Sequence, residues 1–162
     1  MLLGPIQVSP DGLRADVRVD APVRAVFDHI SDLHTMESWW PEHPVYRRLR
    51  GDGGAGSLYA WVYVVQRFPI PGLSRVLVRA PDTRFEYRAG PPGVGIRIGY
   101  RFTPEADGTR IGFSFLSPFA RAPSFAAHLV PEVSRALDRL AAHLARSRNG
   151  AGAGSGGAGG RD

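Results

Sequence analysis

The chain has 162 residues, of which 43% are hydrophobic and 22% charged, a composition typical of one globular domain with a real core. It contains no cysteine, which excludes a disulfide framework, thiolate catalysis and a thiolate metal site. The formal net charge is +5 and all 20 basic residues are arginine, but acidic residues are spread throughout, so we expect a solvated surface and no nucleic-acid partner. No apolar run approaches the roughly 18 residues of a membrane span, and residues 1–8 lack the features of a signal peptide. We therefore expect a cytoplasmic protein.

The first part of the chain predicts one strand followed by two short helices. Residues 13–20 alternate apolar and charged side chains, which is typical of a half-buried strand. From Pro22 the spacing of the apolar residues changes to that of a helix, and a second short helix is expected over residues 33–40. Residues 45–50 then predict another strand.

A glycine-rich segment, residues 51–56, separates this strand from the next one, which we expect over residues 57–67. The glycines could suggest a phosphate-binding loop, but no Lys-Ser/Thr pair follows them, so a hairpin turn is the better interpretation. Residues 68–72 contain two prolines and are predicted to form a loop. Further alternating strands are expected over residues 75–79, 84–88, 95–102 and 111–115, with Asp107-Gly108 as a hairpin turn.

The last regular element is a long helix over residues 131–148. Its apolar residues recur at helical spacing and are Val133, Ala136, Leu137, Leu140 and Leu144. Residues 124–130 predict one or two helical turns that meet this helix at a kink at Pro131. Residues 150–162 are nearly all Gly, Ala and Ser, so we expect a single domain over residues 1–149 and a disordered tail over 150–162.

This order of elements predicts an α+β fold. About six to seven antiparallel strands would curl around the long C-terminal helix, which must bury its apolar stripe against the sheet.

Several short motifs resemble the START-like (SRPBCC) superfamily, which includes polyketide cyclases, aromatases and carriers of hydrophobic ligands. They are Val19-Asp20-Ala21-Pro22-Val23-Arg24-Ala25-Val26-Phe27, Trp40-Pro41-Glu42, Tyr59-Ala60-Trp61-Val62, Asp107-Gly108-Thr109 and Ala127-His128-Leu129. The resemblance covers roughly residues 11–148 and implies the helix-grip fold of that superfamily. Such motifs specify a fold better than a reaction.

One departure from the aromatase pattern bears on mechanism. Aromatase members carry a cavity arginine four residues after the tryptophan that corresponds to Trp61, and this chain has Val65 there. The nearest cation in the same strand phase is Arg67, at the end of the strand.

The predicted inward-facing side chains are rich in aromatic residues, and they suggest a ligand cavity. Phenylalanines alone would fit a packed core, but a buried tyrosine hydroxyl without a partner costs about 1–3 kcal/mol, so several of them indicate a space with water or a polar ligand. We expect this cavity to be lined by Trp40, Tyr59, Trp61, Tyr87, Tyr100, Phe113, Phe115 and Phe125.

Candidate catalytic residues are Arg67 or Tyr63, to polarise a carbonyl, and His128, to act as a general base, although a surface position on the helix is the alternative for His128. The remaining histidines lack the spacing of metal ligands, so we expect no metal and no cofactor. Expected partners are a hydrophobic or polyketide-like small molecule and, as a candidate, an acyl carrier protein, with the chain a monomer or homodimer.

Two functions compete on this evidence. The first is a cofactor-free cyclase or dehydratase acting on a polyketide-type intermediate, because a cavity that holds reacting carbons together can supply much of the acceleration. The second is a non-catalytic carrier of a lipid, quinone or other hydrophobic molecule. A protein-interaction module that uses residues 68–73 has weaker support.

Overall fold

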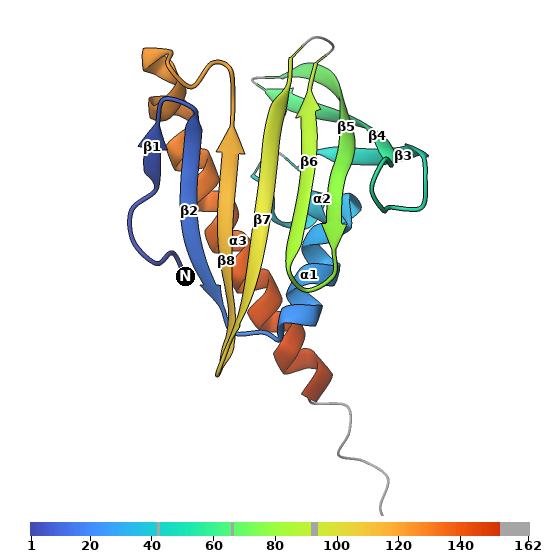
Figure 1. Ribbon diagram of the computed structural model, residues 1–162, viewed down its shortest axis with the longest axis vertical. Helices are drawn as coiled ribbons and strands as arrows, with labels where there is room; N and C mark the ends of the chain where they lie inside the picture. The colour runs from blue at the N-terminus through green and yellow to red at the C-terminus, as the bar shows by residue number, and fades with distance from the viewer. Residues whose placement is uncertain (42, 66, 92–93, 153–162) are drawn as a thin grey trace, which may run out of the picture.

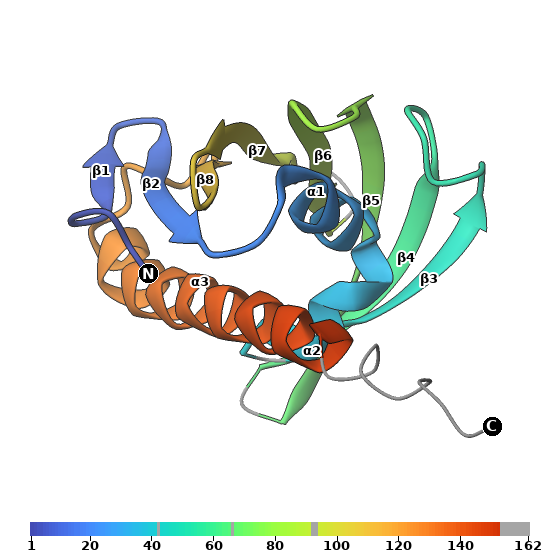
Figure 2. The ribbon, with the colours of Figure 1, turned by 90° about the horizontal axis from the view of Figure 1, so that it is seen from below.

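The computed structural model describes residues 1–41, 43–65, 67–91 and 94–152, and it shows an antiparallel sheet arched over helices (Figure 1). The elements are β1 (Gln7–Ser9), β2 (Gly12–Val19), α1 (Val23–Ser31), the 3-10 turn η1 (Leu33–Thr35), α2 (Met36–Trp39), β3 (Val45–Arg50), β4 (Leu58–Val65), β5 (Phe68–Ala80), β6 (Arg84–Gly90), β7 (Ile96–Glu105), β8 (Gly108–Leu116) and α3 (Pro123–Gly152). Figure 2 shows the sheet as an arch, with α3 crossing its open side and α1 lying under it.

The predicted α+β helix-grip layout is confirmed, but the strand count was too low. Eight strands lie in the order β1-β2-β8-β7-β6-β5-β4-β3, and every neighbouring pair is antiparallel. The additional strand is the three-residue β1, which pairs with the start of β2. Its sequence, Gln7-Val8-Ser9, is too short to show alternation, so periodicity could not reveal it.

Residues 68–72 also differ from the expectation, because they form the first part of β5 and not a loop. They pair with β4, where Phe68 lies opposite Val65 and Gly72 lies opposite Trp61. The pairing of β5 with β6 begins only at Leu73. Pro69 and Pro71 therefore lie where β5 has a neighbour on one side only, and a strand edge tolerates a residue that lacks an N–H.

Strand alternation places one face of the sheet against the helices. In β2, Leu13, Val17 and Val19 are almost fully buried, and across the β2–β8 pairing Leu13 lies opposite Phe115 and Val17 opposite Ile111. Burying side chains of this size contributes about 1.5–3 kcal/mol each. This inner face and the helices that cover it form the core.

The long C-terminal helix packs as predicted. All five residues of its apolar stripe are buried, and α3 contacts β2 and α2. It is one helix from Pro123 onward with Pro131 inside it, so the segment before Pro131 belongs to the same helix. The helix continues to Gly152, slightly past the expected stop, and the remainder of the expected tail, residues 153–162, lies outside the described residues.

The glycine-rich segment between β3 and β4 is a turn, as its sequence indicates. Gly51 has φ +87° and Gly53 φ +100°, a region that favours glycine. The Gly53 N–H donates to the Ser57 hydroxyl at 2.9 Å, and the Gly54 N–H donates to Asp52 Oδ1 at 2.8 Å. Local hydrogen bonds thus account for the backbone donors that a phosphate would otherwise use.

Within the described residues, no helix combines the length and the apolar character that crossing a membrane requires.

Candidate functional site

The inner face of the sheet carries the aromatic residues that the strand phase predicts. Cross-strand pairing sets Trp61 opposite Gly72, and Tyr100 opposite both Phe85 and Phe113. The buried members of the predicted set are Tyr59, Trp61, Phe85, Tyr87, Tyr100, Phe113 and Phe115, while Tyr63 is half-buried. One face therefore gathers aromatic residues from the four strands β4, β6, β7 and β8.

Four tyrosines and a serine on this face converge, and we call Tyr46, Tyr63, Tyr87, Tyr100 and Ser74 the tyrosine cluster. Burial raises the pKa of Tyr46, Tyr87 and Tyr100, and the nearby Tyr100, Tyr46 and Tyr63 hydroxyls raise that of Tyr87 further. The Tyr87 hydroxyl also donates to Met36 Sδ at 3.5 Å, which ties α2 to the cluster. These phenols stay protonated at neutral pH and can serve as hydrogen-bond donors.

Several polar atoms around the cluster are buried without a hydrogen-bond partner among the described residues. They are the Tyr100 hydroxyl, Ser74 Oγ, Trp39 Nε1 and Trp61 Nε1. Buried polar groups in folded proteins are nearly always paired with protein or with ordered water. Three of these atoms belong to the inner face of the sheet and Trp39 Nε1 belongs to α2, and a polar ligand or water could complete their hydrogen bonds.

Trp61 owes its position to a glycine on the neighbouring strand. Its indole lies across Gly72 so closely that a Cβ there would be 2.1 Å from the ring. The same indole meets Tyr63 edge to face with ring centroids 5.1 Å apart. Trp40, another residue predicted to bind ligand, is also buried, and the centroids of the Trp40 and Trp39 rings are 5.8 Å apart. Gly72 thus leaves the space that the largest side chain of the inner face needs.

An apolar pocket of about 450 Å³ lies between the first turns of α3 and the ends of β7 and β8. We call it the α3 pocket, and its lining includes Ile96, Phe115, Phe119, Phe125, His128 and Leu129. The Phe115 and Phe125 rings are 6.2 Å apart across it. Three residues predicted to bind ligand or to catalyse, Phe115, Phe125 and His128, therefore border one hollow.

Arg67 does not lie on the inner face, where its strand phase had placed it. β4 ends at Val65, and Arg67 is an exposed residue of the β4–β5 turn with φ +73°. The strand phase on which the expectation depended does not extend into the turn. Among the predicted catalytic residues, Tyr63 belongs to the tyrosine cluster, and Arg67 lies at the hairpin tip.

His128 is exposed, and its Nε2 lies 3.4 Å from Glu132 Oε1, one helical turn away. His29 stacks on His143 with ring centroids 4.8 Å apart. Burial and the neighbouring His143 together lower the pKa of His29 from 6.5 to about 4, against a smaller opposing effect of Asp32. Over the described ranges, no three His, Asp or Glu side chains are grouped as metal ligands.

Arg79 is an inner-face arginine that the sequence did not reveal. β5 is irregular between Val76 and Val78, and this shift sets Arg79 opposite Phe85, on the inner side. Its guanidinium donates to Ser31 Oγ at 3.2 Å and lies 5.8 Å from the centre of the Phe27 ring. An alternating pattern cannot signal a bulge of this kind, so its only visible sign would have been the consecutive Val-Leu-Val run before it.

Comparison with known protein families identifies the family of this chain. The sequence model of the family described as "Polyketide cyclase / dehydrase and lipid transport" matches residues 12–145. The chain belongs to this family. None of the curated proteins matches it in sequence.

Solved structures share the fold of this polyketide cyclase/dehydrase family member at low sequence identity. Protein Ms6760 from Mycobacterium smegmatis is 15% identical with a TM-score of 0.71, and the match covers 91% of this chain and 99% of that one. A protein from Arthrobacter aurescens is 13% identical with a TM-score of 0.74, covering 90% and 93%. DynU16, from the dynemicin biosynthetic locus, is 20% identical with a TM-score of 0.62, covering 81% and 46%. At these identities the likeness establishes the fold.

Proposed function

We propose that the protein binds a hydrophobic, oxygen-bearing small molecule of polyketide type and promotes its cyclisation or dehydration without a cofactor. The observation that carries this proposal is the set of four buried polar atoms without partners, three on the inner face of the sheet and one on α2. A ligand with carbonyl or hydroxyl oxygens could accept from the Trp39 and Trp61 N–H groups and from the Tyr100 hydroxyl. The family description, which names polyketide cyclases and dehydrases, supports this substrate class.

In this proposal the tyrosine cluster polarises a carbonyl and does not remove a proton. The raised pKa of Tyr87 and Tyr100 keeps both phenols protonated, so the Tyr100 hydroxyl can donate a hydrogen bond to an oxygen that gains negative charge, and the Tyr87 hydroxyl can do so if it turns away from Met36 Sδ. His128, at the border of the α3 pocket, is the candidate base for a substrate that extends into that pocket. Confinement of the flexible chain would supply much of the rate acceleration.

A second candidate function is a non-catalytic carrier of a hydrophobic molecule. It is favoured by the positions of Arg67 and His128, because both side chains are exposed and neither belongs to the tyrosine cluster. A carrier needs apolar surface and a few donors, and it needs no base.

The three tryptophans provide the test, since Trp39, Trp40 and Trp61 are the only tryptophans and all are buried on or beside the inner face. Titration with hydroxylated polycyclic aromatic compounds should change the tryptophan fluorescence saturably, and Tyr100→Phe should weaken the binding. Incubation with a poly-β-keto thioester should then yield a cyclised product faster than the uncatalysed reaction. Binding without product would select the carrier, and no saturable binding would refute both functions.

A further inference from the structure

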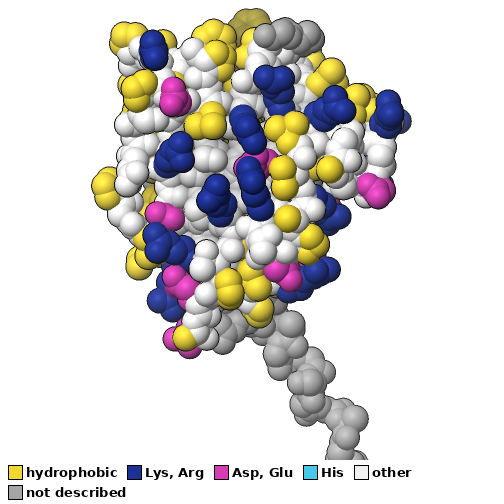
Figure 3. All heavy atoms as spheres, viewed as in Figure 1, with side chains coloured by type: hydrophobic (Ala, Val, Ile, Leu, Met, Phe, Trp, Pro, Cys, Tyr) yellow, Lys and Arg dark blue, Asp and Glu magenta, His cyan; other side chains and the backbone are white. Residues whose placement is uncertain are grey.

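The outer face of the sheet, away from α3, contains a second, polar groove of about 540 Å³, which Tyr100 of the tyrosine cluster also borders. We call it the outer groove, and its lining includes one serine and six charged residues, Ser114, Arg14, Asp16, Arg84, Glu86, Arg97 and Arg101. Figure 3 shows arginine side chains gathered at the centre of this face around an acidic one. Nothing in the proposed cyclase or carrier function uses this surface.

The groove exists because side chains are missing from the middle of the outer face. Across β2, β8, β7 and β6, one row of paired residues is Arg14, Ser114, Gly99 and Glu86, and the next is Asp16, Gly112, Arg101 and Arg84. Neither Gly99 nor Gly112 has a positive φ, so the backbone does not require glycine at either position. Glycine in a strand interior weakens the strand and often marks a close approach by another molecule.

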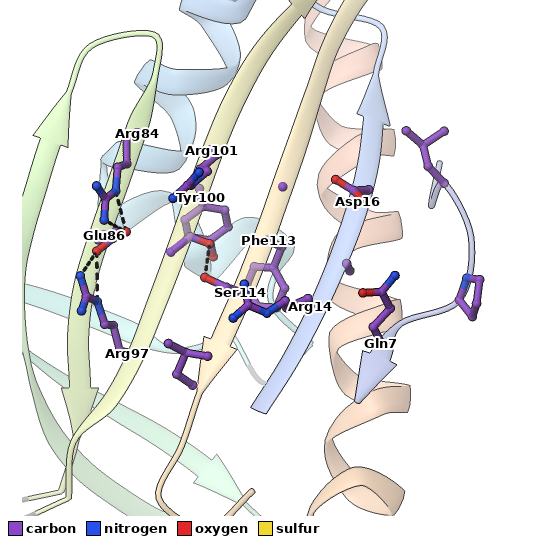
Figure 4. Close-up of a pocket in the computed structure, with 16 residues that line it drawn as sticks. Gln7, Arg14, Asp16, Arg84, Glu86, Arg97, Tyr100, Arg101, Phe113 and Ser114 are labelled. Carbon is purple, nitrogen blue, oxygen red and sulfur yellow. Dashed lines mark hydrogen bonds and ion pairs between the residues drawn. The ribbon is translucent and has the colours of Figure 1, made fainter. Parts of the chain in front are cut away.

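The carboxylates near the groove are already neutralised by particular arginines. Glu86 is held by Arg84 and by Arg97, whose Nη2 is 2.5 Å from Glu86 Oε2, as the dashed lines in Figure 4 show. Asp16 Oδ2 lies 3.2 Å from Arg110 Nη2. These ion pairs leave the other two groove arginines without an acidic partner.

The side chains of Arg14 and Arg101 form no ion pair or hydrogen bond with any residue that the structure describes. Figure 4 shows Arg14 reaching from β2 across β8 toward Ser114, while Arg101 stands on β7 at the upper side of the hollow. Arg101 is also directly opposite Arg84 across the β6–β7 pairing, and like charges in that relation repel. Four arginines and two carboxylates line the groove, so its lining carries a net charge of +2.

We propose that the outer groove binds a phosphate monoester, with Arg14 and Arg101 as its principal ligands. Such a group carries nearly two negative charges at neutral pH and so matches the charge of the lining. A guanidinium offers two parallel N–H donors to phosphate oxygens. The Ser114 hydroxyl, whose present contact to the Gly99 carbonyl is 3.4 Å long, can donate to a third oxygen. The hollow over Gly112 gives the phosphate room to approach the backbone, and the space over Gly99 holds the Ser114 hydroxyl.

The phosphate could belong to a soluble metabolite or to a lipid headgroup, and calorimetric titration at low ionic strength separates these sources. The probes are inorganic phosphate, glycerol phosphate, and phosphatidylcholine vesicles with or without phosphatidic acid. We expect saturable binding that Arg14→Gln and Arg101→Gln each weaken by about tenfold. Arg47→Gln is the matched control, because Arg47 is an exposed arginine of β3, opposite Ala60 and outside the groove.

A steric variant distinguishes a formed site from general attraction to positive charge. A Cβ at Gly112 would meet its nearest neighbours at 3.7 and 3.8 Å, so Gly112→Val is expected to fold while it fills the hollow. It should weaken binding without any change in charge. If the protein binds only the vesicles that contain phosphatidic acid, the site is assigned to a lipid headgroup. If it binds the soluble probes, the site is assigned to a phosphorylated metabolite. Equal affinities in the parent, Arg14→Gln, Arg101→Gln and Gly112→Val, or no saturable binding of any probe, would overturn the proposal.

Discussion

Replacing Tyr100 by phenylalanine should make the ligand-free protein more stable and its ligand binding weaker. The Tyr100 side chain is almost completely buried, and its hydroxyl forms no well-aligned hydrogen bond with the described residues, although the Tyr87 hydroxyl lies close enough for a weak one. Leaving such a group unsatisfied costs about 1–3 kcal/mol. The hydroxyls of Tyr87 and Tyr46 are near enough to influence it, which places the expected gain at the lower end, about 1 kcal/mol.

The measurement is urea or thermal unfolding of the ligand-free protein, and the melting temperature should rise by about 2–4 °C. Phenylalanine keeps the ring that contacts Phe113 at 5.4 Å, so no cavity forms. Thr109→Val is the matched control, because it also deletes a buried hydroxyl, but one that donates to the Ala21 carbonyl at 2.8 Å. That variant should lose about 1 kcal/mol.

The two variants should therefore change the free energy of unfolding in opposite directions. If Tyr100→Phe destabilised the protein as much as Thr109→Val, the Tyr100 hydroxyl would have a partner in the ligand-free state. The inner face would then be an ordinary core, and the main support for a polar ligand would be lost.

Three further outcomes follow from the same geometry. If the proposed ligand site adjoins the indole, Trp61→Ala should cost less than the about 3–5 kcal/mol typical of a filled core, and urea unfolding with and without ligand measures the difference. Glu86→Gln should lower the stability at neutral pH by about 1 kcal/mol. Burial alone would raise the pKa of Glu86, but Arg97 and Arg84 outweigh it and hold the pKa below 4.5, so the difference from the parent should disappear in acid. His29 keeps a pKa of about 4 in the folded state against 6.5 ordinarily, so only the unfolded chain takes up a proton between these values. Stability should fall as the pH drops from 6.5 toward 4, and His29→Gln should flatten that part of the curve.

Strand phase explains why most of the inner face could be predicted from the sequence. Side chains alternate between faces with a period of two, so Trp61 and Tyr63 in β4 and Tyr100 in β7 share one face as long as no residue is inserted. The stripe of α3 was equally visible, since its apolar residues recur at helical spacing over several turns. Local periodicity was sufficient wherever an element was long and regular.

Predictions from side-chain alternation failed where the backbone is irregular. The bulge between Val76 and Val78 turns Arg79 inward, and the early end of β4 leaves Arg67 in a turn. Residues 68–72 join the sheet by pairing with β4, and their prolines are tolerated because β6 does not reach them, which their own sequence does not show. The outer groove was missed for a related reason, since Gly99 and Gly112 are adjacent only through the register of β7 and β8.

The cyclase and the carrier differ in what they demand of the tyrosine cluster, and the pKa directions limit the choice. Phenols whose pKa is raised by burial can donate to a carbonyl oxygen, but they cannot act as bases near neutral pH. Each donor would add only a few kcal/mol to transition-state stabilisation, whereas holding reacting groups together can contribute about 7–11 kcal/mol. A cyclase built on this face would therefore owe most of its rate to how closely the inner face confines the substrate. The donors would then select which carbonyl is polarised, so loss of the Tyr100 hydroxyl should redistribute products before it abolishes turnover.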